Sequence, residues 1–208
     1  DKLIPLVKAN CTTKFDESID LSFCINNKQK KNEINIRTAV TLPSGTGKKI
    51  KLAVICEDDK ASTAKDAGAD IVGGDDLIDE IKNGKTNFEK LICTPSMMIK
   101  LSKLGKVLGP KGLMPNPKLG TVSDDLKNAV KNAKSGQVEI RNDKDGNIGV
   151  SIGKKSFSDD NLIKNFKAIL ETLEKEKNNN NVKGNLIKNS FVTSTMGISF
   201  KLKLEKAI

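Results

Sequence analysis

Short apolar runs alternate with helical patterns between residues 44 and 135, and this alternation limits the possible folds more than any other feature of the chain. Strands that alternate with helices are typical of parallel βαβ units. We therefore expect a small three-layer α/β unit, with Ser123 as the cap of its last helix. Its buried strands are expected at residues 50–56, 70–72 and 88–93, and its other helices at 75–82, at 96–104 and in an alanine-rich stretch that ends near Gly68.

The two flanks of this unit show a different pattern. Residues 19–25 alternate apolar with more polar side chains, as expected for a half-buried antiparallel strand. An Asp-Gly pair at 145–146 indicates a hairpin turn, and Ser158 precedes an amphipathic helix whose apolar residues recur three and four positions apart. Further strands are expected at 36–42, 137–142, 147–152, 186–193 and 198–204, with a polar linker at 178–181.

Residues 1–43 are too few to bury a core of their own, so they must pack on another part of the chain. Their antiparallel pattern matches that of residues 136–208. We therefore predict a split α+β domain, 1–43 plus 136–208, into which an α/β domain, 44–135, is inserted. The chain crosses between the domains near 43–45 and near 135–136, and these two crossings predict a double hinge.

The charge balance indicates a polyanionic partner. Lys and Arg total 36 against 26 acidic residues, which gives a net charge of +10 and a pI near 9.4. The alternative is a basic protein without a nucleic-acid partner. The chain has no Trp or Tyr and only seven Phe, which argues against the capture of single strands on an aromatic platform and favours shape recognition of folded RNA.

The absence of histidine removes imidazole bases, histidine metal sites and Ser-His or Cys-His dyads. We expect no enzymatic activity, no metal and no cofactor. Cys11, Cys24, Cys56 and Cys93 stand singly among apolar or small residues and are interpreted as reduced core thiols.

No apolar run approaches the roughly 18 to 20 residues that a membrane span needs, and no secretory segment opens the chain. We expect a soluble protein without a membrane partner, in a reducing compartment. The chain begins inside a helical pattern at 3–7, so residues upstream are expected, and a cleaved targeting sequence is left open.

A glycine-rich stretch at 44–49 invites comparison with a phosphate-binding loop. Such a loop needs a glycine where Leu42 stands and Ser or Thr where Lys49 stands. We therefore interpret the stretch as a flexible hinge and not as a nucleotide site.

A second loop carries unbalanced positive charge. Residues 90–123 include six lysines and no acid, and prolines and glycines are expected to keep 104–118 free of helix and strand. An unpaired cationic loop suits phosphate contact, whereas the alternative is a solvated surface loop. The candidates for contact with tRNA or a second RNA are Lys103, Lys106, Lys111 and Lys118.

Short hydroxyl side chains and a glycine at 193–197 would let a backbone approach RNA closely and reach 2′-hydroxyls, although alone the segment also reads as a turn between strands. Arg37 and Arg141, the only arginines, suit bidentate phosphate or guanine contact. Structural ion pairs are an equal alternative for both arginines.

Six stretches together resemble the bacterial form of the large-subunit ribosomal protein L-one family, the family of the mobile stalk protein. They lie in the family's order over nearly the whole chain, and the Gly-Pro-Lys-Gly-Leu-Met-Pro-Asn-Pro-Lys run is the most specific. The stretches are 13–18, 42–47, 67–74, 109–118 with 120–122, 141–144 and 194–197.

The resemblance implies a split α+β domain and an inserted Rossmann-like three-layer α/β domain without a nucleotide. It also implies a structural role on the large-subunit ribosomal RNA stalk near the tRNA exit site, help in the release of deacylated tRNA, and repression through the protein's own messenger RNA. The ribosome would be that of a bacterial cytoplasm or a bacterial-type organelle, mitochondrion or plastid. The candidate RNA-binding residues are Lys14, Phe15, Arg37, Arg141, Lys144, Thr193, Ser194, Thr195, Met196 and Gly197.

Two alternatives from other functional classes stay open at this point. The βαβ pattern at 44–135 also suits a small α/β enzyme, although fold class alone confers no function. A free RNA-binding repressor that acts away from the ribosome is the other alternative, and co-sedimentation with ribosomes would separate it from a ribosomal protein.

Overall fold

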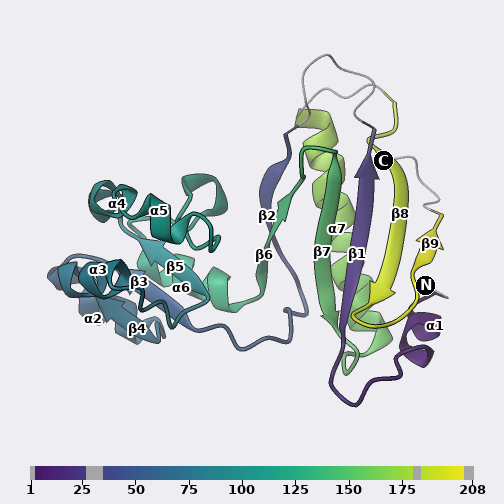
Figure 1. The fold of residues 1–208 in the computed structure, drawn as a ribbon, viewed down its shortest axis with the longest axis horizontal. Helices are drawn as coiled ribbons and strands as arrows, with labels where there is room; N and C mark the ends of the chain where they lie inside the picture. Colours follow the sequence, from purple (N-terminus) through teal and green to yellow (C-terminus); the bar gives the residue numbers. More distant parts are fainter. Residues whose placement is uncertain (1–2, 27–34, 180–183, 204–208) are drawn as a thin grey trace. The chain divides into compact units, whose positions relative to one another are not determined.

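Three β-sheets organise the computed structural model, which describes residues 3–26, 35–179 and 184–203 (Figure 1). The chain divides into two units. Unit 1 comprises Asp1–Gly47 and Gly136–Ile208, and unit 2 comprises Lys48–Ser135. The two units are described separately below.

Unit 1 is built on a four-stranded antiparallel sheet of order β7-β1-β8-β9. A second sheet pairs β2 with β6, also antiparallel. Alternate residues of β1 are buried, and they share one core with apolar residues of α7. The elements are α1 (Leu3–Ala9), β1 (Ser18–Ile25), β2 (Arg37–Thr41), β6 (Gln137–Arg141), β7 (Asn147–Lys154), α7 (Asp159–Asn179), β8 (Ile187–Ser194) and β9 (Phe200–Leu202).

Unit 2 is a three-layer α/β sandwich around a parallel sheet of order β4-β3-β5. All four residues of β3 are buried, because helices cover both faces of the sheet. The fold class, α/β combined with α+β, is therefore confirmed. The elements are β3 (Leu52–Ile55), α2 (Asp58–Asp66), β4 (Ile71–Gly73), α3 (Asp75–Lys82), β5 (Lys90–Cys93), α4 (Pro95–Ser102), α5 (Gly105–Leu108), a 3-10 helix η2 (Pro117–Leu119) and α6 (Leu126–Lys134).

The expectation that residues 104–118 form neither helix nor strand is wrong in two places, because α5 and η2 lie there. Leu108 is fully buried in the core of unit 2, and this burial stabilises the helical turn Gly105–Leu108. Gly109 caps the turn, and Pro110, which has no amide hydrogen, follows it.

Three boundaries also differ from the prediction. Asp125, not Ser123, caps α6, and its carboxylate accepts a hydrogen bond from the Asn128 amide at 3.2 Å. Helix α7 continues through Asn179 into the predicted linker, of which residues 180–181 lie outside the described residues. The last strand is shorter than predicted, at Phe200–Leu202.

The glycine-rich segment 42–47 is anchored within unit 1 by Asn165 of α7. The buried Asn165 side chain accepts from the Ser44 amide at 3.0 Å and donates to the carbonyl oxygens of Gly45 at 3.0 Å and Ile152 at 2.7 Å. Gly136 has a φ of +91°, and a Cβ there would lie 2.6 Å from the Gly45 Cα. The backbone therefore enters and leaves the inserted segment at neighbouring points.

All four cysteines are free. Cys11, Cys56 and Cys93 are buried, and burial raises the pKa of the Cys93 thiol to about 11; Cys24 is only half-buried. Within the described ranges, no helix has the length and apolar character to cross a membrane. No group of three or more Cys, Asp or Glu side chains in the same ranges could hold a metal ion.

Candidate RNA-binding site

Two segments leave the four-stranded sheet of unit 1 at the same end. Strand β1 begins at Ser18 and β8 ends at Ser194, and Ile19 pairs with Ser194 in antiparallel register. The segment before β1 and the turn after β8 therefore start from adjacent strand ends (Figure 1). Both segments include residues that the sequence predicts to contact RNA, and for that reason we call residues 13–17 and 194–198 together the RNA-binding edge.

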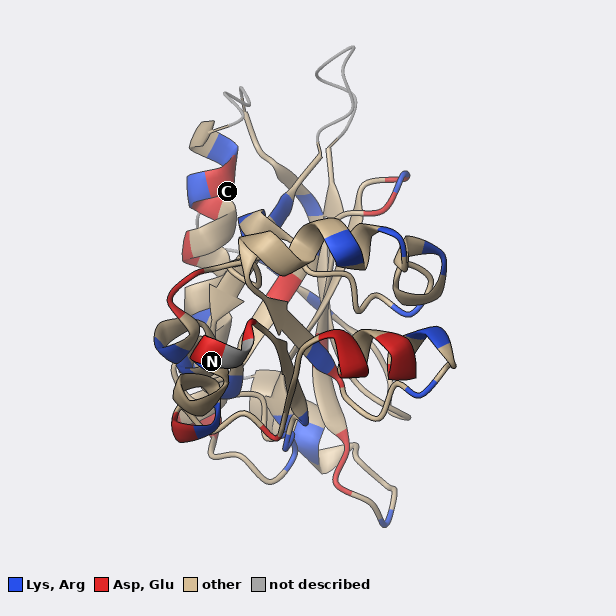
Figure 2. Cartoon of the chain, turned by 90° about the vertical axis from the view of Figure 1, so that its left-hand side faces the viewer, with Lys and Arg blue, Asp and Glu red and all other residues tan. Residues whose placement is uncertain are grey.

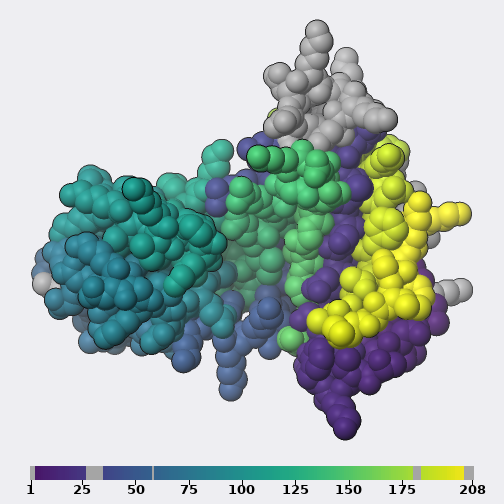
Figure 3. Space-filling view, in the orientation of Figure 1, coloured from purple at the N-terminus to yellow at the C-terminus, as the bar shows by residue number. Residues whose placement is uncertain are grey.

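Backbone and side-chain hydrogen bonds hold the turn on the start of β1. The Thr195 amide donates to the Ser18 carbonyl at 3.1 Å, and the Thr195 hydroxyl accepts from the Ser18 amide at 3.0 Å. The Gly197 amide donates to the Ser194 carbonyl at 3.3 Å. In space-filling view the turn lies against the N-terminal segment (Figure 3).

Glu17 links the two halves of the edge through its buried carboxylate. One oxygen accepts from the Thr13 hydroxyl at 2.6 Å and the Thr13 amide at 3.4 Å, and the other accepts from the Met196 amide at 3.1 Å. The Thr13 hydroxyl contributes most to lowering the pKa of Glu17 to about 2 from its ordinary 4.5. The buried Ser194 hydroxyl adds to the lowering, although it forms no regular hydrogen bond within the described residues.

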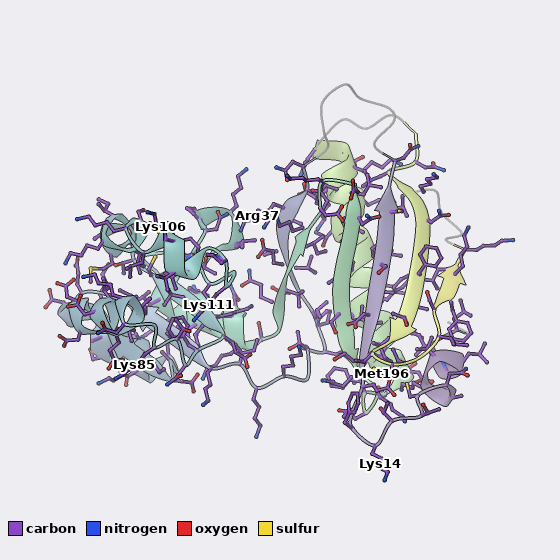
Figure 4. The ribbon with its side chains drawn as sticks, in the orientation of Figure 1. Lys14, Arg37, Lys85, Lys106, Lys111 and Met196 are labelled. Carbon is purple, nitrogen blue, oxygen red and sulfur yellow. The ribbon has the colours of Figure 1, made fainter. Side chains whose placement is uncertain are left out.

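The edge presents apolar and cationic side chains to solvent. Phe15 is 54% exposed, Met196 70% and Ile198 60%, and Lys14 is exposed beside them. Figure 4 shows Lys14 and Met196 at the same end of unit 1. Exposed large apolar groups next to a cation are features of surfaces that stack on bases and contact phosphates.

A side chain at Gly197 would require the Ser194 hydroxyl to move. A Cβ at this position would lie 2.2 Å from the Ser194 Oγ, far inside van der Waals contact. Thr193 and Ser194 are less available than predicted: Ser194 is buried, and the half-buried Thr193 hydroxyl donates to the Ser194 carbonyl at 3.0 Å. Both side chains shape the turn.

Arg37, Arg141 and Lys144 are not brought to this edge. Arg37 and Arg141 are direct partners across the β2–β6 sheet, and the Arg37 Nε lies 2.8 Å from a Glu139 carboxylate oxygen. Lys144 is exposed in the turn between β6 and β7. That turn lies beside the other end of β1, because the Ile25 amide donates to the Gly146 carbonyl at 2.7 Å. These three residues therefore lie away from the RNA-binding edge.

The predicted lysines of unit 2 are all exposed: Lys103, Lys106, Lys111 and Lys118. Within the described part of the chain none of them forms an ion pair, whereas Lys60, Lys100 and Lys134 pair with aspartates. Figure 2 shows the distribution of both charge signs. The Lys111 ammonium donates to the Thr86 hydroxyl at 2.6 Å, and this bond brings the loop of the exposed Lys85 close to the predicted lysine loop (Figure 4).

Residues 7–198 match the sequence model of the "Ribosomal protein L1p/L10e family". The chain belongs to this family. Three bacterial relatives carry the name "Large ribosomal subunit protein uL1". The protein of Pelagibacter ubique (strain HTCC1062) is 76% identical over 208 residues, which cover 100% of this chain and 91% of the relative.

Two more distant relatives agree. The protein of Prochlorococcus marinus (strain NATL1A) is 47% identical over 203 residues, 98% of this chain and 86% of the relative. That of Rickettsia akari (strain Hartford) is 46% identical over 198 residues, 95% of this chain and 82% of the relative. The predicted family, a bacterial-type protein of the large ribosomal subunit, is confirmed.

Two residues of this ribosomal protein were missed by sequence reasoning. The role of Glu17 is not predictable from the sequence, because no local pattern indicates that this acid is buried. Lys85 follows α3 and lies outside the acid-free stretch, and the contact of its loop with Lys111 through Thr86 depends on the fold. The only sequence signal for Lys85 is its position just after a predicted helix end, next to Gly84.

Proposed function

We propose that the protein binds the stalk of large-subunit ribosomal RNA through the RNA-binding edge of unit 1. The observation that carries this proposal is the convergence of Lys14 and Phe15 with Thr195, Met196 and Gly197 at one end of the sheet, joined through Glu17 and Ser18. Membership of a large-subunit ribosomal family supports RNA as the ligand.

The chemistry of each part suits folded RNA. Lys14 supplies a charge for phosphate, and Phe15 and Met196 supply exposed apolar surface for a base or ribose. Gly197 lets the RNA approach the backbone closely. The Thr195 hydroxyl accepts from the Ser18 amide at 3.0 Å and donates to the Ser18 carbonyl at 3.4 Å, which fixes the turn. Its second lone pair is left to accept a hydrogen bond from RNA.

We propose a second RNA contact, to deacylated tRNA at the exit site, through the exposed lysines of unit 2. Lys103, Lys106, Lys111 and Lys118 lack acidic partners in the described residues, which leaves their charge available for phosphates. Arg37, Arg141 and Lys144 form a further candidate contact. Through these contacts the protein would assist the release of deacylated tRNA as the stalk moves.

The two-domain organisation belongs to this proposal. We propose that 1–43 with 136–208 and 44–135 act as separate domains, a split RNA-binding domain and an inserted Rossmann-like domain. Binding of a similar RNA fold in the protein's own messenger would make it a translational repressor. No catalytic role is proposed.

Binding to a stalk fragment of large-subunit ribosomal RNA, titrated across salt with a scrambled stem as competitor, tests the proposal. We expect tight, fragment-selective binding with a steep salt dependence. Lys14→Ala should weaken binding and lower the salt slope by about one. Lys175→Ala, an exposed lysine of α7, serves as the matched control. Equal affinity for the scrambled stem would contradict the proposal.

A further inference from the structure

Glu17 is the one fully buried acid among the described residues, and no Lys or Arg in the same ranges forms an ion pair with it. A buried carboxylate without a cation is costly unless hydrogen bonds stabilise its charge. Here the donors are two amides and a hydroxyl, which come from Thr13 and Met196, on opposite halves of the RNA-binding edge. A group in this position links parts of the chain that are 179 residues apart in sequence.

We propose that Glu17 is a positioning residue for RNA: its carboxylate holds segment 13–17 and turn 194–198 in their binding arrangement before RNA arrives. This inference rests on the proposed function of the edge. Because Glu17 is buried, it does not itself touch RNA, and burial under the turn also separates its charge from RNA phosphates.

The segment before β1 is also fixed from the side of β7, and Thr195 is already bonded to Ser18. The part of the turn that Glu17 holds is therefore Met196. The Lys155 ammonium donates to the Cys11 carbonyl at 3.0 Å, and the Lys154 ammonium to the Asp16 carbonyl at 3.2 Å. The Asp16 carboxylate accepts from the Ser156 hydroxyl at 2.8 Å. These bonds hold 11–16 but do not involve Met196 or Gly197.

A carboxylate is suited to this position because both of its oxygens accept hydrogen bonds. Glutamine has one carbonyl oxygen, and its amide group would face a donor at the second position. If the turn is ordered in only a fraction of the molecules, the apparent affinity for RNA equals the intrinsic affinity multiplied by that fraction. Loss of the Thr13 or Met196 bond is therefore expected to weaken RNA binding without removing any phosphate contact.

The test uses the full chain and the stalk RNA fragment, with Glu17→Gln and Thr13→Val as variants. Thr12→Val is the matched control, because Thr12 is exposed and adjacent. We expect both variants to bind about three- to tenfold more weakly, as loss of one hydrogen bond of ordinary net strength implies. Thr12→Val should bind like the wild type.

Two further readouts separate positioning from a general structural role. The slope of log affinity against log salt should stay at the wild-type value, because no cation is lost. Amide exchange should accelerate at Met196 and Gly197 while the amides of β1 and β7 keep their protection.

Wild-type affinity in both variants overturns the inference. Weaker binding with exchange accelerated equally across the whole sheet also overturns it, because Glu17 would then support the fold in general. If the wild type itself does not prefer the stalk fragment to the scrambled stem, the proposed function fails and the inference falls with it. The wild-type control thus distinguishes the two failures.

Discussion

Replacement of Asn165 by alanine should destabilise unit 1 by about 2 to 5 kcal/mol. The side chain is fully buried and makes three hydrogen bonds. Water can reach the half-buried Ser44 and Gly45 after the substitution, so each of these two bonds contributes about 0.5 to 1 kcal/mol. The buried Ile152 carbonyl would stay unpaired, which costs about 1 to 3 kcal/mol. The upper limit of the range applies if water does not reach the Ile152 carbonyl after the substitution.

Urea unfolding measures this loss. The unfolding is monitored through amide exchange of the β1 and β7 residues, so that unit 1 is observed separately. Asn161→Ala is the matched control, because Asn161 lies one turn earlier on α7 and is only half-buried. We expect less than about 1 kcal/mol for the control. A loss for Asn165→Ala no larger than for the control would refute the argument that the three bonds hold segment 42–47.

Three other predictions concern RNA and pH. Thr195→Val should reduce stalk RNA affinity by about 1 to 3 kcal/mol, because it removes a hydroxyl from the RNA surface and unpairs the Ser18 amide; equilibrium binding measures this, and unchanged affinity would remove Thr195 from the site. Lys106→Ala and Lys111→Ala should each flatten the salt dependence of tRNA binding by about one unit of slope, and an unchanged slope would favour a solvated loop. The lowered pKa of Glu17 means that its stabilisation is complete above pH 4.5 and is lost as pH falls toward 2. Protection of the Met196 amide should follow that window, and Glu17→Gln should abolish the dependence.

Local sequence patterns determine much of this fold. The helix Asp75–Lys82 was predicted to the residue, because acids in its first turn and Gly84 beyond its end mark both boundaries. The alternation of apolar and polar residues in β1 likewise predicts its buried face, because successive side chains of a strand point to opposite faces. The turn of α5 was missed because its stability comes from the burial of Leu108 against distant parts of unit 2, which no local pattern shows.

The candidate site was less predictable. The pairing of Lys14 and Phe15 with turn 194–197 came from the family resemblance, since residues so far apart in sequence give no local signal. The role of Glu17 depends on a hydrogen bond to Met196 that exists only after β1 and β8 pair. The Arg37–Arg141 pairing likewise depends on the pairing of β2 with β6, two strands that all of unit 2 separates in sequence.

The close approach of Gly45 and Gly136 bears on the order in which the chain folds. Strands β2 and β6 pair like a hairpin whose turn has been replaced by Lys48–Ser135. Unit 2 is one continuous segment, so it can fold as soon as the chain has been synthesised through Ser135. Unit 1 must wait for β7, α7 and β8. During synthesis we therefore expect unit 2 to fold first and to shorten the effective loop that β2 and β6 must close.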